Sequence, residues 1–414
     1  MQAQLDCREL GRLVRRLSLP TFGLAFGVAV LTTYAPVLLG RSTDSGAAIG
    51  IAIGAEGAFA LFLPVMIGSL SDRTRTRLGR RLPYALVATP LLVAPLALLP
   101  FSSSYAGTVA LVSLFYVGYF VYYPPYQALF ADLVPATYAG RAQGTQGVAR
   151  GLGLGAALVG GGLLLSVWAP LPFLLGAAAV VLTTAALVRS VPISHAPVAL
   201  SQTPKLLRLL RERPDLRSFA VANALWEGSF MGLRTFIVLY VVQGLGQSMT
   251  TATAVIGVVA VSYVAAAAVS GRVADRIGVL RLMRGSIWVY GAGLLFAAAV
   301  SSVAPLLAVL PLVALAGAVL MTLPYGLLMQ LTPAGSEGAV SGLFNLSRAV
   351  GIVLGPIVVG TAIDVGGSFF PATHGYGAMW LAIGVPIVLS LAFLPSAAAE
   401  KEPAAALDDL ALSA

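Results

Sequence analysis

Long apolar runs, separated by short stretches rich in proline, glycine and arginine, follow one another along almost the whole chain. A helix needs about twenty apolar residues to cross the hydrocarbon core of a membrane, and most of the runs reach that length. We therefore predict an all-α polytopic membrane protein with twelve transmembrane helices. The expected spans are residues 18–40, 46–70, 83–101, 104–130, 143–167, 170–190, 218–243, 250–270, 284–303, 305–330, 339–363 and 376–395.

The composition excludes other classes of protein. Hydrophobic residues make up 58% of the 414 positions, and charged residues make up 10%, against about a quarter in an ordinary soluble domain. So few charges cannot cover the surface of a soluble protein of this size. Twelve spans with short loops also leave no room for a separate soluble domain.

The basic residues predict the orientation in the membrane. If the N-terminus is cytoplasmic, the inner loops and termini hold twenty-one of the twenty-five lysines and arginines, whereas the outer loops hold only Arg41. Cytoplasmic loops are enriched in these residues. Both termini are therefore expected on the cytoplasmic side of a bacterial inner membrane, and the net charge of +9 is interpreted as membrane anchoring rather than nucleic-acid binding. The first run is too long for a signal peptide and is expected to be retained.

The longest loop divides the spans into two groups of six. We expect an N-terminal bundle at 1–190, a cytoplasmic linker at 191–217, a C-terminal bundle at 218–395 and a disordered tail at 396–414. The linker segment PKLLRLLRERPDLR is either a solvated connection, which we favour, or a basic amphipathic helix on the membrane surface.

Three landmarks recur in the two halves at nearly constant offsets, which predicts an internal repeat. Two pseudo-symmetric six-helix bundles would then enclose a site near the middle of the membrane that opens alternately to either side. The pairs are Gly68/Asp72/Arg73 with Gly271/Asp275/Arg276 at an offset of 203, Pro125-Tyr126 with Pro324-Tyr325 at 199, and Gly144/Arg150/Gly153 with Gly342/Arg348/Gly351 at 198.

These motifs resemble the major facilitator superfamily. The loop from Gly68 to Tyr84, GSLSDRTRTRLGRRLPY, is similar to the signature of that superfamily between helices 2 and 3. Its longer spacing and GRRxP ending look most like the glycoside–pentoside–hexuronide:cation symporters and the sucrose:proton symporters. The segment 127–133, QALFADL, resembles the RALLADL element of the sucrose carriers, with Gln127 in place of its arginine, and Thr33–Gly40 weakly resembles their first helix.

The resemblance implies a secondary transporter of sugars or glycosides, but one feature departs from it. Cation symporters of this group carry acidic residues on helix 2 where this chain has Ala60 and Pro64. A sodium site of that type is therefore doubtful, and Glu56 is the acid on this helix. We expect symport driven by a proton gradient rather than by sodium.

The residues of the 68–81 loop predict a gate even without the family resemblance. Gly68 would permit close approach of helix 2 to a neighbour, Asp72 would cap or face a helix N-terminus, and Arg73 and Arg77 would pair with Asp132. Such a latch would hold the inner gate shut in one state. The alternatives are that the loop only anchors the chain and that the second copy, Asp275 and Arg276, is only structural.

Five charges lie within the expected spans, where they are costly and usually face a cavity or a partner. Proton coupling is assigned to Glu56, Glu227 and Arg234, and gating to Arg150 and Arg348. The alternative is a neutralised structural network in which Glu227 pairs with Arg234 and the other arginines bind helix carbonyls or Asp132.

Aromatic and amide side chains provide candidates for solute binding, because sugars stack on aromatic faces and bond to amides. The same residue types also populate packed cores and membrane interfaces. The candidates are Tyr126, Gln127, Gln146, Asn223, Trp226 and Asn345.

Enzymatic chemistry is not expected. The one cysteine, Cys7, excludes an intrachain disulfide and a cysteine-built metal site, His195 and His374 lie in expected loops, and no P-loop is present. We expect no metal or other cofactor, a monomer in the bilayer, and a small-molecule substrate. The competing functions are a proton-coupled exporter of amphipathic compounds or drugs and a non-transporting membrane sensor on the same scaffold.

Overall fold

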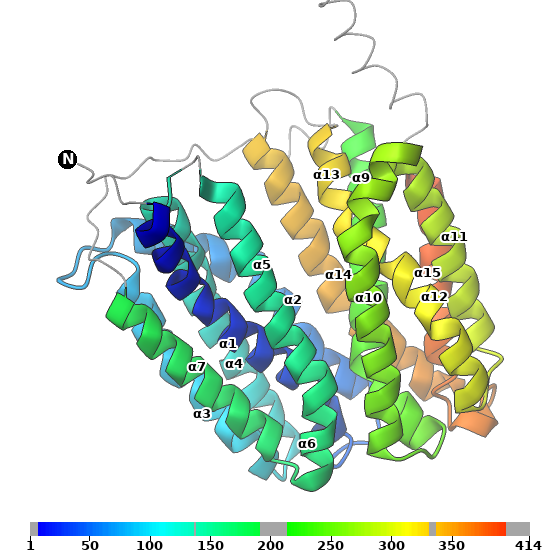
Figure 1. The fold of residues 1–414 in the computed structure, drawn as a ribbon. Coiled ribbons are helices and arrows are strands. Elements are labelled where there is room, and N and C mark those ends of the chain that lie inside the picture. The colour runs from blue at the N-terminus through cyan, green and yellow to red at the C-terminus, as the bar shows by residue number, and fades with distance from the viewer. Residues whose placement is uncertain (1–6, 136–137, 191–212, 331–336, 395–414) are drawn as a thin grey trace, which may run out of the picture.

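A computed structural model describes residues 7–135, 138–190, 213–330 and 337–394 of the chain. Long helices run side by side in these ranges, and Figure 1 shows them as two groups. The first group consists of α1 (Cys7–Leu39), α2 (Gly46–Arg73), α3 (Leu82–Leu98), α4 (Tyr105–Leu133), α5 (Ala139–Gly155), α6 (Gly161–Val167) and α7 (Leu171–Ser190). The second consists of α9 (Pro214–Leu239), α10 (Met249–Ile277), α11 (Val279–Ala297), α12 (Val303–Thr322), α13 (Pro324–Gln330), α14 (Glu337–Gly366) and α15 (Ala378–Leu389).

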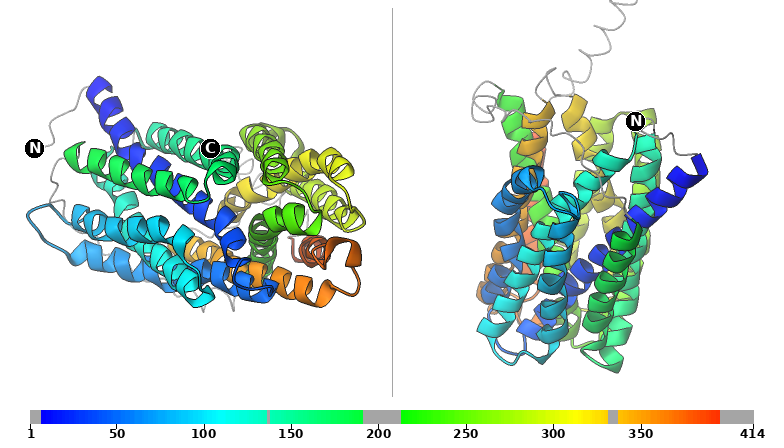
Figure 2. Two further views of the ribbon diagram at one scale, coloured as in Figure 1. Left: turned by 90° about the horizontal axis from the view of Figure 1, so that it is seen from below. Right: turned by 90° about the vertical axis from the view of Figure 1, so that its left-hand side faces the viewer.

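The predicted all-α membrane fold is confirmed. In the described ranges, ten helices are long and apolar enough to cross a membrane. Two more helices occupy the places of the ninth and twelfth expected spans: α11, which carries Arg281 and Arg284 near its start, and the shorter apolar segment Ala378–Phe393. The two six-helix bundles lie next to each other and are seen from two further sides in Figure 2.

Three spans are less regular than the apolar runs predict. The fifth is continued by a π-helical turn, Ala156–Gly160, between α5 and α6, and the seventh ends in another, Tyr240–Gly244. The tenth span, expected as one helix over 305–330, is interrupted at Leu323, because Pro324 lacks the N–H that a continuous helix would use there.

Equivalent glycines of the internal repeat pack in equivalent ways. A Cβ on Gly153 of α5 would collide with the backbone of Phe22 on α1, and a Cβ on Gly351 of α14 would collide with that of Ala224 on α9. Both glycines therefore hold the fifth helix of their half against the first. This packing relates the two bundles as the sequence repeat predicts.

The two ends of the bundles differ in charge. The start of α1, the connection from α2 to α3, the end of α7 and the junction of α10 with α11 carry arginines and lie at one end, which we call the arginine-rich face. The other end, which carries Arg41, is called the opposite face. Most of the expected linker and the expected tail lie outside the described residues, but α9 already begins at Pro214, so residues 214–217 are helical.

Candidate functional site

Helices α2 and α14 close the opposite face by backbone-to-backbone contact. A Cβ on Gly50 would collide with Pro356, one on Gly54 would lie 2.8 Å from the carbonyl oxygen of Val353, and one on Gly57 would lie 2.5 Å from that of Ala349. Small residues permit such close packing of membrane helices. Since α2 and α14 belong to different bundles, this contact joins the two halves.

A carboxylate adds a polar latch at the end of this contact. Asp364 of α14 accepts hydrogen bonds from the Ser45 hydroxyl at 2.8 Å and from the backbone N–H groups of Gly46 and Ala47 at 2.5 and 3.0 Å. These groups form the N-terminus of α2, where the helix dipole favours a negative charge. The first turn of α2 is therefore held by a residue of the other bundle.

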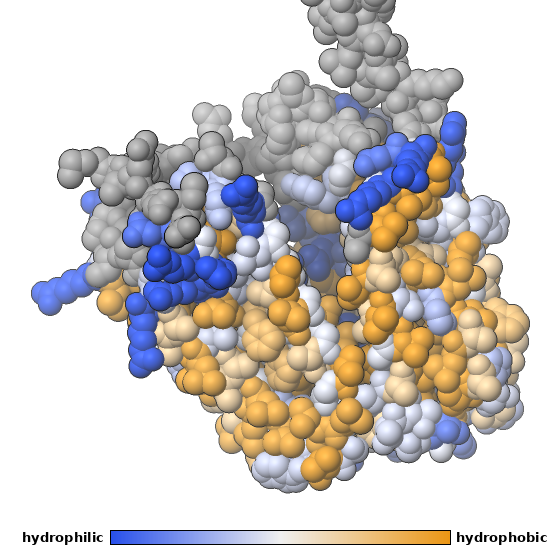
Figure 3. All heavy atoms as spheres, in the orientation of Figure 1, coloured by the Kyte–Doolittle hydropathy of each residue, from blue (hydrophilic) through white to orange (hydrophobic). Residues whose placement is uncertain are grey.

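The arginine-rich face is open between the bundles. Figure 3 shows a hollow there with hydrophilic atoms at its base. Arg150 of α5 and Asn345 and Arg348 of α14, which belong to different bundles, are exposed beside this space. Because the opposite face is closed, the structure is a state with one-sided access to the space between the bundles.

An ion pair between α9 and α14 lies beside this space. Glu227 of α9 is 9% exposed, and its Oε1 lies 3.1 Å from the Nε of Arg348 of α14. The Arg348 side chain is 53% exposed, so its guanidinium also reaches the open side. The structural alternative in which Glu227 pairs with Arg234 is wrong, because the Glu227 carboxylate binds Arg348 instead.

Glu56 of α2 forms the centre of a second group of charges. It interacts electrostatically with Arg234 of α9 and with Arg348, and Arg234 also interacts with Tyr116 and Tyr119 of α4. The Glu56 carboxylate and the Tyr116 hydroxyl are buried beside each other. A buried carboxylate with so few partners is rare and calls for an explanation.

Arg150 of α5 is the fifth charge of this group and belongs to the N-terminal bundle. Its Nη2 donates a hydrogen bond of 2.7 Å to the hydroxyl of Tyr123, and its side chain is exposed. Tyr123 stacks on Tyr119, with ring centroids 5.2 Å apart. We call Glu56, Glu227, Arg150, Arg234 and Arg348 the midplane charge cluster; it contains all five span charges that the sequence singles out and draws on both bundles.

Three of the expected solute-binding residues lie in the helix-packing core instead. The Tyr126 hydroxyl bonds with Thr21 at 2.7 Å, the Asn223 amide donates to Ser347 at 2.9 Å, and the Trp226 indole donates to Ser390 at 2.8 Å. Each of the three is at most 2% exposed. These contacts tie neighbouring helices of one bundle together, so the expectation that these residues line a cavity is wrong.

The remaining candidates are placed differently. Gln146 of α5 donates to the Gln127 side chain at 3.1 Å, which leaves the Gln127 Nε2 buried without a partner among the described residues. Asn345 is exposed on α14, three residues before Arg348. Both Gln127 and Asn345 remain predictions for solute contact.

The predicted gate has other partners than expected. Asp132 of α4 is bound by Arg80 at 2.6 Å and by Arg81 at 3.2 Å, not by Arg73 or Arg77, and Arg81 also reaches Asp72 at 2.7 Å. All of these residues belong to the N-terminal bundle. The network is intact while the arginine-rich face is open, so in this state it braces the connection from α2 to α3 against α4 and does not join the two bundles.

The glycine of the gate motif is not a packing glycine in this state. Among the described residues, nothing lies within 4 Å of the Cβ position of Gly68, and the same holds for its repeat partner Gly271. Asp275 and Arg276 are exposed in the last turn of α10. The close approach expected at Gly68 occurs instead in the first half of α2, nearer the opposite face.

The aromatic wall of the cluster is formed by other tyrosines of α4 than the expected Tyr126. Tyr119 and Tyr123 lie one helical turn apart and face the charges, whereas Tyr122 and Tyr126 face α1 and α7, where Tyr122 bonds with Thr184 at 2.9 Å. The spacing divides these tyrosines into two faces. The spacing does not show which of the two faces lines the cavity.

In the described part of the chain, no three His, Cys, Asp or Glu side chains come together in a way that could hold a metal ion. The charges of the cluster instead belong to two carboxylates and three guanidinium groups. Such a set can exchange ion-pair partners, take up a proton or bind a polar solute.

Two helical bundles around a charged space that is closed at one face define a membrane transporter rather than an enzyme. The sequence model of the Major Facilitator Superfamily matches residues 17–356 and, in a second match, 219–411. The chain belongs to this superfamily. No curated protein matches it.

Solved structures share the fold. A bacterial homologue of the human lysosomal transporter Spinster, inward-facing and unoccupied, is similar with a TM-score of 0.75 at 17% identity over 94% of this chain and 96% of that one. The nucleoside transporter NupG has a TM-score of 0.75 at 17% identity, over 95% of this chain and 99% of that one. A D-xylose-proton symporter has a TM-score of 0.70 at 16% identity, over 94% of this chain and 98% of that one. The narrower resemblance to the sucrose and glycoside symporters stays a prediction.

Proposed function

We propose that the protein is a proton-coupled secondary transporter that carries a small polar solute across the bacterial inner membrane by alternating access. The observation that carries this proposal is the midplane charge cluster, which both bundles build between a closed face and an open one. Placing five charges within membrane spans is costly, and packing of the fold alone does not require them.

The arginine-rich face is assigned to the cytoplasm. Basic residues collect on the cytoplasmic side of membrane proteins, and in the described ranges they collect at the end where the cluster is accessible. The structure then corresponds to an inward-open state. Transport requires a second state in which the α2–α14 contact opens and the arginine-rich halves of the bundles meet.

Proton coupling is assigned to Glu56. Its carboxylate shares Arg234 with two tyrosines, so a proton on Glu56 would release Arg234 for another partner. A released guanidinium can bind a solute oxygen, which would make protonation and solute binding depend on each other. Glu227 is the second candidate, since its pairing with Arg348 offers the same exchange.

The solute is expected to be a sugar or glycoside. The stacked rings of Tyr119 and Tyr123 offer an apolar face, and Arg150 beside them offers hydrogen-bond donors. Two structures with this fold are named for a nucleoside and for D-xylose, which are solutes of similar size and polarity. The same aromatic face would also suit the second candidate, export of amphipathic compounds.

Uptake into vesicles tests the proposal. Reconstituted protein is given a pH gradient and a panel of labelled sugars, nucleosides and cationic dyes. Glu56→Gln keeps the size and hydrogen bonding of the side chain but cannot titrate. We expect this variant to exchange solute across the membrane at equilibrium but to lose accumulation driven by the gradient.

The matched control is Asp44→Asn, which removes an exposed carboxylate near the opposite face. It should accumulate solute as the natural protein does. Undiminished accumulation by Glu56→Gln would contradict the role of Glu56 and direct attention to Glu227. Absence of gradient-driven movement for every solute would contradict proton-coupled transport itself.

A further inference from the structure

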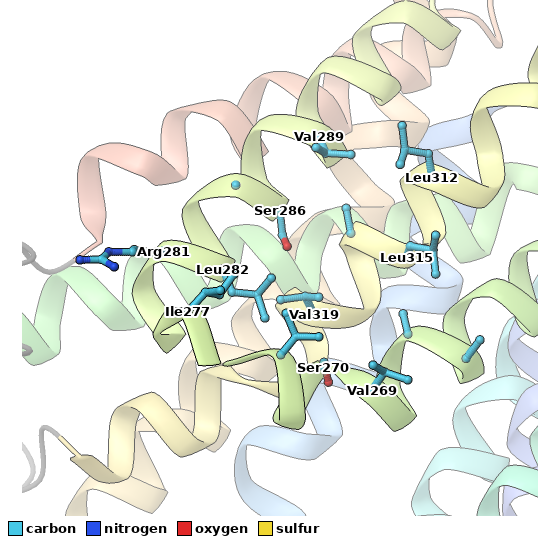
Figure 4. A pocket seen from close by; sticks show the side chains of 15 residues that line it. Val269, Ser270, Ile277, Arg281, Leu282, Ser286, Val289, Leu312, Leu315 and Val319 are labelled. Carbon is cyan, nitrogen blue, oxygen red and sulfur yellow. The ribbon is translucent and has the colours of Figure 1, made fainter. Parts of the chain in front are cut away.

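We propose that the C-terminal bundle binds an anionic phospholipid, with one acyl chain in a groove between α10, α11 and α12 and the headgroup on Arg281. The groove has a volume of about 610 Å³. It lies outside the midplane charge cluster and shares no lining residue with it. Figure 4 shows aliphatic side chains from the three helices around it and Arg281 at its edge.

Small residues create the groove. Ala265, Ala266, Gly285 and Ala316 contribute to its lining, from all three helices. Among the described residues nothing lies within 4 Å of the Cβ position of Gly285. At these positions the side chains are too small to fill the space between the helices, and the surface that they leave is apolar.

The length of the groove fits one leaflet. Along α11 the lining extends from Arg281 to Val289, which at 1.5 Å per residue is about 12 Å. Half of the hydrocarbon core of a membrane is about 15 Å. A lipid chain that starts at the arginine-rich face would therefore end near the middle of the bilayer, where the groove ends at Val289 and Leu312.

Charge identifies the headgroup. Residues 265–297 contain four arginines and one acid, Asp275. Arg272, Arg276 and Arg281 are exposed at the junction of α10 and α11, where the headgroups of that leaflet would lie. Basic pockets between membrane helices on this side favour anionic lipids. A zwitterionic lipid would fill the groove equally well but would gain less from the arginines.

Native mass spectrometry of the full-length protein tests this inference independently of transport. The protein is reconstituted into an equal mixture of phosphatidylglycerol and phosphatidylcholine, extracted, and analysed for the lipids that it retains. We expect a preference for phosphatidylglycerol that Arg281→Gln lowers about fivefold, from roughly 1 kcal/mol per basic residue at the surface. Arg281→Lys should keep most of the preference.

Two further variants separate the chain site from the headgroup site. Gly285→Leu extends a side chain into the groove from a position whose Cβ has no neighbour within 4 Å among the described residues, and it should lower the retention of both lipids while leaving thermal stability in place. Arg41→Gln removes an arginine from the opposite face and should change nothing. Equal retention of the two lipids by the natural protein, a loss as large in Arg41→Gln, or a lipid-free dimer covering the groove would overturn the proposal.

Discussion

Removal of the Asp364 latch should shift the protein toward the state that is open at the opposite face. In Asp364→Ala the Ser45 hydroxyl and two N–H groups at the start of α2 lose their carboxylate acceptor. A hydrogen bond to a charged group contributes about 1.5–3 kcal/mol when buried, and a charge at a helix end about 0.3–1 kcal/mol.

Asp364 is exposed, so water replaces part of what is lost. We therefore expect a net shift of about 1–2 kcal/mol, which is a roughly 5- to 30-fold change in the ratio of the two states. Asp364→Asn keeps one acceptor oxygen and should shift the ratio less. The glycine contacts below the latch are unchanged by either substitution.

Distances between spin labels on the opposite face measure this ratio. Phe101 and Phe369 are exposed there, one in each bundle, and can carry labels once Cys7 is replaced by serine. The population with the longer distance should grow in Asp364→Ala. Thr361→Ala, a matched change on the same helix, should leave it unaltered. An unchanged distribution in Asp364→Ala would refute the idea that this carboxylate holds the two halves together.

Three further changes have expected outcomes. Arg81→Ala leaves Asp132 paired with Arg80 alone and removes the bonds of Arg81 to Asp72 and Ser71. It should lower the free energy of unfolding by about 1.5–3 kcal/mol, the range for hydrogen bonds to charged groups; an unchanged melting temperature would contradict this. Gly54→Leu places a side chain against α14 and should lengthen the same label distance as Asp364→Ala; a shorter or unchanged distance would count against the glycine contact. Tyr123→Phe removes the bond to Arg150 and should raise the solute concentration for half-maximal uptake by about 2- to 10-fold, whereas an effect on protein yield alone would indicate a folding role.

The helices and the charged site could be predicted because their physical causes are local. A run of apolar residues long enough to cross a membrane is visible in the sequence, and so is a charge within it. Glu56 and Arg348 lie far apart along the chain, but the cost of exposing either to lipid directs both toward the interior. The internal repeat then indicates that this interior lies between two similar bundles.

The partners of each charge could not be predicted, because they depend on packing. Glu227 and Arg234 share a helix face, but seven residues at 1.5 Å each separate their Cα atoms by about 10.5 Å along the axis. The neighbouring helix α14 places Arg348 closer to Glu227 than Arg234 is. Similarly, Gly79 adopts a φ of 83° that turns the chain before α3 and presents Arg80 and Arg81, rather than Arg77, to Asp132.

The backbone contact between α2 and α14 has a consequence for the entrance that forms when these helices part. Gly50, Gly54 and Gly57 carry no side chains, so separation of the helices breaks no interlocked rotamers and leaves no polar group without its helical hydrogen bond. At these three positions the newly exposed wall of α2 would present backbone alone. We therefore expect discrimination between permeants to depend more on the aromatic rings of Tyr119 and Tyr123 deeper in the protein than on this stretch of α2.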